Sequence, residues 1–197
     1  STGLNLSCTT LWRFKKWGTG PKHRGWLKLH AMADLDTEEI IAWAITDDGV
    51  GDSKVFDVLY RHAISTGHKL SAVYADNAYD SIKHWKLLKE DNVKFVTRFK
   101  STTSGKSRGC VERGNMAKLW IRCEGENWAE LTGYGFRWKI ECTFSDLKRM
   151  VSEFVAARKK KGWIREIFQK IVFFNIHKQI RADIMGTTGN GVKVAGC

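Results

Sequence analysis

The segment from residue 26 to residue 99 alternates between β-rich runs and helix-like stretches, and this order limits the fold more than any other feature of the chain. It opens with "WLKLHAMAD" (26–34) and "EIIAWAITD" (39–47), which flank the polar turn "DLDTE" and predict a β-hairpin. Helical and strand patterns alternate beyond the hairpin. We therefore expect a mixed sheet flanked by helices, in an α/β or α+β fold.

Local patterns place the remaining elements along the chain. Residues 10–26 and 100–115 are rich in basic residues and glycine and are expected to be loops, the second of them mobile. The expected helices cover 51–66, 79–91, about 126–150 and 162–184, and the expected strands cover 69–76 and 93–99.

The last expected helix, 162–184, carries an apolar stripe that predicts core packing or a subunit contact. The members of the stripe are Ile164, Ile167, Phe168, Ile171, Phe174 and Ile180.

The glycine-rich residues 185–197 are expected to form a flexible tail.

Composition narrows the class of protein. A chain of 197 residues fits one domain, and 43% hydrophobic residues with nine tryptophans exclude global disorder. No apolar run reaches the roughly 18 residues that a membrane span needs, so a membrane is not an expected partner. The cysteines are odd in number, scattered and without a C-x-x-C pair, which argues against a zinc cage or a disulfide framework and favours a reducing, cytoplasmic location.

The charge predicts a polyanionic partner. Thirty-three Lys and Arg residues against 21 Asp and Glu residues give a net charge of +12, and the excess is concentrated between residues 137 and 181. A second basic patch lies at "RFKKW" (13–17) and "KHR" (22–24). The alternative is a merely basic soluble protein, but this clustering favours nucleic acid.

The segment "YGFRWKIECTFSDLKR" (134–149) has an unusual helical pattern. At about 100° per residue, Tyr134, Arg137, Glu141 and Lys148 fall at roughly 0°, 300°, 340° and 320°, so they share one narrow stripe of a helix. A solvated charged face would explain any mixture of polar residues. One carboxylate among cationic groups instead suggests a site that faces an anion, a metal ion or both.

A second carboxylate, Asp76, ends the strand predicted over 69–76. Binding sites of open α/β sheets lie beyond the carboxyl ends of strands, so Asp76 is a candidate ligand, although a turn or cap residue is the alternative. Asp76 and Glu141 would offer the hard oxygen ligands that suit Mg²⁺ or Mn²⁺. Other acidic residues have structural interpretations: Asp34 and Asp36 as turn residues and Asp52 as a helix cap.

The pattern Tyr134-x₂-Arg137-x₃-Glu141-x₆-Lys148 resembles, in every position, the signature helix of insertion-sequence DDE transposases. "VYADNAYDS" resembles the family's second-carboxylate strand, and "KLHAMADLDTEEIIAWAITDDGVGDSKVF" resembles its intervening hairpin and helix. The similarity covers about residues 1–180. It implies a ribonuclease-H-like fold, a catalytic domain over residues 1–184, and Mg²⁺- or Mn²⁺-dependent strand cleavage and strand transfer at element ends.

The resemblance also implies roles and partners. Asp76 would be the second catalytic acidic residue and Glu141 the third, and both would bind metal. Lys148 would contact DNA near the cleaved phosphate, and Tyr134 and Arg137 would contact DNA or brace the helix. The expected partner is double-stranded DNA, as terminal repeats and as target, with a homodimer and a nucleoid-associated location in a prokaryotic cytoplasm.

The family's first aspartate directly precedes a Ser-Thr-Gly step in the opening strand, and this chain begins at Ser1 with that step. We therefore expect a truncated first strand and a chain that folds but does not cleave DNA as it stands. Two alternatives remain: a catalytically dead DNA-binding remnant of a decayed element, and a metal nuclease of the same fold acting on RNA or hybrids. The absence of an aromatic base-stacking motif disfavours RNA.

Overall fold

The computed structural model describes residues 1–6, 26–123, 126–185 and 192–196. The loop expected over 10–26, with its basic patch, lies outside the described residues except for Trp26. The described chain forms one mixed sheet flanked by helices, as the order of elements predicts.

The sheet has seven strands, with neighbours in the order β5-β4-β7-β2-β1-β6 and with β3 on the free side of β2. β2 runs antiparallel to β1, β3 and β7, whereas β4 runs parallel to β5 and β7. The carboxyl ends of β4, β5 and β7 therefore meet at one edge of the sheet. The strands are β1 (Thr2–Leu6), β2 (Trp26–Asp34), β3 (Ile40–Asp47), β4 (Leu70–Ala75), β5 (Lys94–Thr97), β6 (Phe154–Val155) and β7 (Val192–Gly196).

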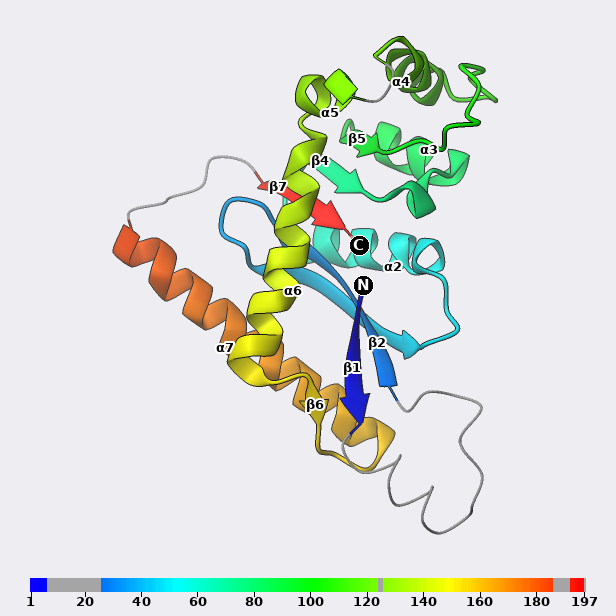
Figure 1. The fold of residues 1–197 in the computed structure, drawn as a ribbon. Coiled ribbons are helices and arrows are strands. Elements are labelled where there is room, and N and C mark those ends of the chain that lie inside the picture. The colour runs from blue at the N-terminus through cyan, green and yellow to red at the C-terminus, as the bar shows by residue number, and fades with distance from the viewer. Residues whose placement is uncertain (7–25, 124–125, 186–191, 197) are drawn as a thin grey trace.

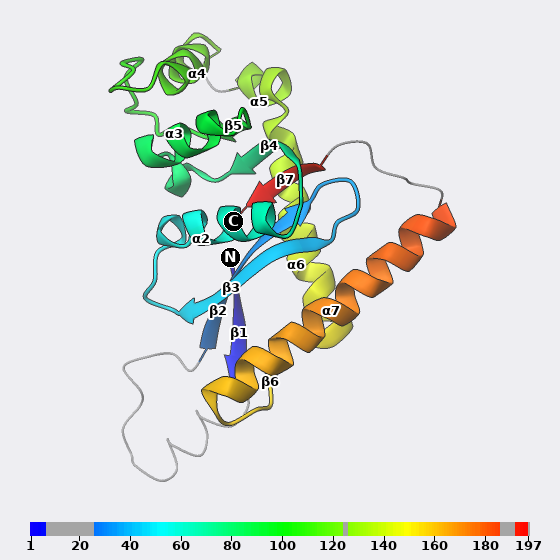
Figure 2. The ribbon, with the colours of Figure 1, turned by 180° about the vertical axis from the view of Figure 1, so that it is seen from behind.

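Helices cover both faces of this sheet: α6 crosses one face and α2 packs on the other (Figures 1 and 2). The α-helices are α2 (Phe56–Ser65), α3 (Ile82–Glu90), α4 (Val111–Arg122), α5 (Glu126–Thr132), α6 (Trp138–Val151) and α7 (Lys160–Met185). Three 3₁₀ turns join them: η1 (Asp52–Lys54), η2 (Asn77–Tyr79) and η3 (Tyr134–Arg137).

β1 and β7 lie along the same side of β2. Thr2 pairs with Leu29, and farther along β2 Gly196 pairs with Met32. β7 pairs with β2 on one side and with β4 on the other, so it joins β4 and β5 to the rest of the sheet. The expected flexible tail is thus corrected for residues 192–196, because their backbone pairs on both sides. Residues 186–191 and 197 lie outside the described part.

The core forms where the buried strands meet the aromatic side chains of α2 and its neighbours. Phe56 of α2 packs against Tyr79 with ring centroids 5.6 Å apart and against Phe95 at 5.8 Å. In β4 every side chain from Ala72 to Ala75 is buried, because both faces of this central strand are covered. This packing holds the carboxyl end of β4 in place.

The mobile loop expected over 100–115 is corrected at its end, because α4 begins at Val111. The sequence pattern does not predict this start, because the first turn of α4 buries Arg113 and Gly114 rather than large apolar side chains. The apolar stripe of α7 is divided between the core and the surface. Ile167, Ile171 and Phe174 are buried, whereas the other expected members, Ile164, Phe168 and Ile180, are exposed.

Buried His30 on β2 predicts a dependence of stability on pH. Its Nε2 lies 2.7 Å from the Thr46 hydroxyl, and its Nδ1 lies 3.4 Å from Asp52. Burial, partly offset by the field of Asp52, lowers the pKa of His30 from 6.5 to about 4. Because the folded pKa lies below the unfolded value, this contribution is complete above pH 6.5 and is lost as the pH falls towards 4.

We therefore expect His30 to account for a loss of about 3 kcal/mol in the free energy of unfolding between pH 7 and pH 4. Urea unfolding across this range measures it, and His30→Gln should show a correspondingly shallower pH dependence. His62→Gln, at an exposed position of α2, is the control and should follow the original chain. Equal pH profiles for the original chain and His30→Gln would contradict this prediction.

Candidate functional site

Asp76 follows directly on β4, as the sequence predicts, and is partly buried. Its side chain accepts a hydrogen bond from the backbone N–H of Asn77 at 2.6 Å and so caps η2. Its carbonyl oxygen accepts a hydrogen bond from the Thr97 hydroxyl at 2.7 Å, which ties the ends of β4 and β5 together. The capping alternative is therefore realised, and the carboxylate stands at the edge where parallel strands end.

Glu141 lies in the first turn of α6, with 60% of its side chain exposed. The helix packs on the sheet through Ile140, Phe144 and Leu147, which leaves Glu141 beside the packed face. Its carboxylate pairs with the Arg137 guanidinium, four residues earlier, at 2.8 Å. A carboxylate in a first helical turn is also stabilised by the helix dipole.

Tyr134 and Arg137 precede α6 in the turn η3, so the continuous helical stripe expected from the sequence is corrected. Gly133, with a φ of 77°, ends the preceding helical segment, and η3 has tighter 3₁₀ geometry. Contacts still connect these residues to the glutamate. The Arg137 guanidinium lies 5.9 Å from the centroid of the Tyr134 ring and pairs with Glu141, which links η3 to the first turn of α6.

Lys148 lies on α6 seven residues after Glu141, about 10 Å farther along the helix axis. Its ammonium lies 3.5 Å from the carboxylate of Glu153, which also accepts a hydrogen bond from Asn5 of β1 at 2.8 Å. Lys148 thus lies beside the end of β1 and does not join the contacts around Glu141. Its side chain is partly exposed.

The elements that carry Asp76 and Glu141 contact each other. The Tyr74 ring, two residues before Asp76, meets the Phe136 ring edge to face at 6.1 Å. A Cβ at Gly133 would lie 3.2 Å from the Tyr74 hydroxyl, tighter than an ordinary contact, and the positive φ of this residue also favours glycine. The end of β4 thus packs against the turn that leads into the Glu141 helix.

Asp76 and Glu141 are chemically suited to a divalent cation, because carboxylate oxygens are the preferred ligands of Mg²⁺ and Mn²⁺. Among the described residues, no three His, Cys, Asp or Glu side chains form a group that could hold a metal ion. A cation held there would take its remaining ligands from water or substrate.

The basic surface expected between residues 137 and 181 is smaller than the charge count suggests. Lys178 is buried and pairs with Glu38 and Asp146, joining α7 to the β2–β3 turn and to α6. Lys170 donates to the carbonyls of Ser152 and Phe154. Both cations are structural. Arg149 and Arg181 are exposed. The other exposed cations cluster at the start of α7, at Arg158, Lys159, Lys160, Lys161 and Arg165.

The other acidic candidates behave largely as structural residues. Asp34 accepts from the backbone N–H of Asp36 at 2.7 Å, so the interpretation of both as turn residues is confirmed. Asp52 begins η1 without a side-chain capping bond, so its interpretation as a helix cap is wrong. Its carboxylate instead pairs with Lys28 at 2.6 Å and accepts from the Ser1 hydroxyl at 3.0 Å.

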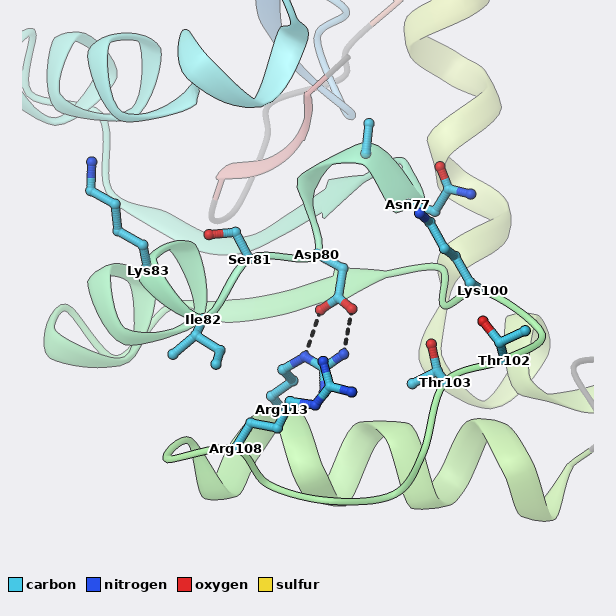
Figure 3. Close-up of a pocket in the computed structure, with 11 residues that line it drawn as sticks. Asn77, Asp80, Ser81, Ile82, Lys83, Lys100, Thr102, Thr103, Arg108 and Arg113 are labelled. Atoms are coloured by element: carbon cyan, nitrogen blue, oxygen red, sulfur yellow. Dashed lines mark hydrogen bonds and ion pairs between the residues drawn. The ribbon is translucent and has the colours of Figure 1, made fainter.

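The sequence interpretation missed a cavity of about 570 Å³ beyond the ends of β4 and β5 (Figure 3). It is lined by Asn77, Asp80, Lys100, Arg108 and Arg113 among others. The one signal in the sequence is the excess of cations over carboxylates between residues 98 and 113. That excess could not reveal which cation is buried.

No helix in the described part of the chain is both long and apolar enough to cross a membrane. No solved structure matches the chain. Its sequence matches the family described as a transposase DDE domain over residues 1–168, which is most of its length. The resemblance carried by the Tyr134–Lys148 motif is thereby confirmed, and the protein belongs to the transposase DDE domain family.

Proposed function

We propose that residues 1–184 form the catalytic domain, with a ribonuclease-H-like fold, of an insertion-sequence transposase that cleaves DNA strands and transfers them at the element ends. Membership of the family implies nuclease or polynucleotidyl transferase chemistry in general. The observation that carries the finer proposal is the contact between the end of β4, which leads into Asp76, and η3, which leads into Glu141.

In this proposal Asp76 and Glu141 would hold Mg²⁺ or Mn²⁺. Such a cation, when bound, activates an attacking oxygen and stabilises the charge that develops on the phosphate. The chain's own residues prepare the site. The Thr97 hydroxyl fixes the backbone at Asp76, and Arg137 orients the Glu141 carboxylate until a cation competes for it. Tyr134 supports Arg137 from the side of η3.

Double-stranded DNA, as terminal repeats and as target, is the partner that the charge supports. Four consecutive exposed cations, Arg158 to Lys161, precede or begin α7. Cations at a helix N-terminus are disfavoured by the helix dipole, whereas a phosphate there is favoured. This arrangement supports phosphate contact at the start of α7, with Lys148 on the neighbouring helix as a further contact.

A homodimer is part of the same proposal. α7 exposes several large apolar side chains that a monomer leaves in water, which supports a contact between subunits. They are Ile164, Phe168, Phe173, Ile176, Ile180 and Ile184.

The test of the shared site is iron-directed backbone cleavage. Fe²⁺ can replace Mg²⁺ at oxygen ligands, and with ascorbate and peroxide it cuts the backbone near the bound ion. We expect two cuts, one near residue 76 and one near residue 141, and both should be lost in Asp76→Asn and in Glu141→Gln.

Glu130→Gln, an exposed glutamate of α5, is the matched control and should keep both cuts. A cut at only one of the two places, or cuts that survive both carboxylate substitutions, would show that Asp76 and Glu141 do not share a cation.

A further inference from the structure

We propose that the cavity beyond β4 and β5 binds a phosphate group of a nucleic-acid strand, next to Asp76. The proposal rests on the proposed function, because it assigns to the same substrate a subsite outside the two carboxylates. The cavity measures about 570 Å³, which is large enough for a nucleotide unit rather than for a lone ion.

The charged side chains of the cavity that have no ion-pair partner among the described residues are cations. Its carboxylate, Asp80, is already saturated: it accepts from Arg113 Nε at 2.9 Å, from Arg113 Nη2 at 2.6 Å and from the Trp85 indole at 3.0 Å. Lys100 and Arg108 also line the cavity, and neither forms an ion pair within the described part of the chain. An anion entering here would therefore meet two uncompensated cations.

Arg113 supplies a separate indication of a missing ligand. Its side chain is only 6% exposed, and its Nη1 is buried without a hydrogen-bond partner among the described residues. The large majority of buried side-chain polar atoms have a hydrogen-bond partner. Figure 3 shows Arg113 directly below Asp80 and beside Arg108, among the residues that line the cavity, where a phosphate oxygen could serve as the acceptor for Nη1.

The walls of the cavity are held in place. Gly114 of α4 lies so close to the loop that a Cβ there would be 2.8 Å from the Cα of Ser107. Ser81 and Ile82 place the N-terminus of α3 at the cavity, and the unpaired N–H groups of a first helical turn favour anions.

The position of the cavity favours a strand of nucleic acid over free phosphate. Asn77 and Ala78 line the cavity and follow Asp76 directly in the sequence. A phosphate bound in the cavity would therefore lie next to the candidate cleavage site at Asp76. A nucleic-acid strand carries a phosphate at each nucleotide, so one strand can place one phosphate at Asp76 and another in the cavity. Inorganic phosphate has the same chemistry but can occupy only one of these two sites at a time.

The test compares Lys100→Ala/Arg108→Ala with Lys106→Ala, a control that removes an exposed cation of the same loop that does not line the cavity. Binding of a fluorescent single-stranded 20-nucleotide DNA is measured in EDTA at several salt concentrations. We expect the double variant to bind at least tenfold more weakly at low salt, with a salt slope reduced by about 0.7 for each lost contact. Lys106→Ala should change affinity less than twofold.

The Trp85 indole N–H resonance, identified with Trp85→Phe, locates the binding. It should shift when the oligonucleotide is added to the original chain and not when it is added to the double variant. Inorganic phosphate should produce the same shift only at far higher concentration.

Equal losses in the double variant and in Lys106→Ala, or an unshifted Trp85 resonance, would overturn the proposal. Inorganic phosphate binding as tightly as the oligonucleotide would identify a free-phosphate site and overturn it too. Because these measurements need no metal ion, they stay independent of the iron-cutting test: either result can fail while the other holds.

Discussion

Glu141→Gln is expected to abolish Mg²⁺-dependent nicking of DNA by a chain that carries an aspartate directly before Ser1, the position at which the family resemblance places the first catalytic aspartate. Glutamine keeps the size of the side chain but removes the charge that attracts the cation and pairs with Arg137. Metal ions supply several kcal/mol of stabilisation to such transition states, so we expect a loss of about 10³-fold or more in rate.

Plasmid nicking measures this rate, and Glu130→Gln serves as the control because it removes an exposed carboxylate of α5. Binding of the same DNA in EDTA should be unchanged by Glu141→Gln. This binding is expected to depend on many exposed cations, and Glu141 is a single exposed carboxylate. Nicking that persists in Glu141→Gln would mean that the reaction uses other residues.

The second large effect concerns folding. Asp80→Ala should lower the free energy of unfolding by about 3–5 kcal/mol, because it leaves the 6%-exposed Arg113 as a buried charge without its partner. The Trp85 indole loses its acceptor as well. Urea unfolding followed by circular dichroism measures the change.

Glu112→Gln is the matched comparison, because Glu112 pairs at 2.7 Å with Lys89 on the surface of the same helix pair. Solvent screens exposed pairs and leaves them little net effect, so this variant should lose far less stability than Asp80→Ala. Equal losses for Asp80→Ala and Glu112→Gln would show that the Asp80–Arg113 pair is not the anchor of α4.

The elements that could be predicted from sequence are those specified locally. The hairpin of β2 and β3, the strand before Asp76 and the stop at Gly67 each follow from a pattern within a few residues, and all three are present. The Arg137–Glu141 pair follows from helical spacing over one turn. The shared site of Asp76 and Glu141 itself stays a prediction.

The features that could not be predicted depend on residues far apart in the chain. Arg113 lies in a polar, glycine-containing stretch, and only Asp80, 33 residues away, makes it a buried anchor. From the sequence alone, Lys178 is expected to be a surface cation. The structure buries it against Glu38, a residue 140 positions away in the chain. In α7 the apolar periodicity identifies the helix, but only its position against the sheet decides which side is buried.

β7 has a consequence for any chain that continues upstream of Ser1. Since Thr2 faces Leu29, each earlier residue of a lengthened β1 would face one residue farther along β2, and the second residue before Ser1 would face Met32. Gly196 already faces Met32. A lengthened first strand and the present last strand would therefore compete for the same backbone hydrogen bonds, and one could enter the sheet only by displacing the other.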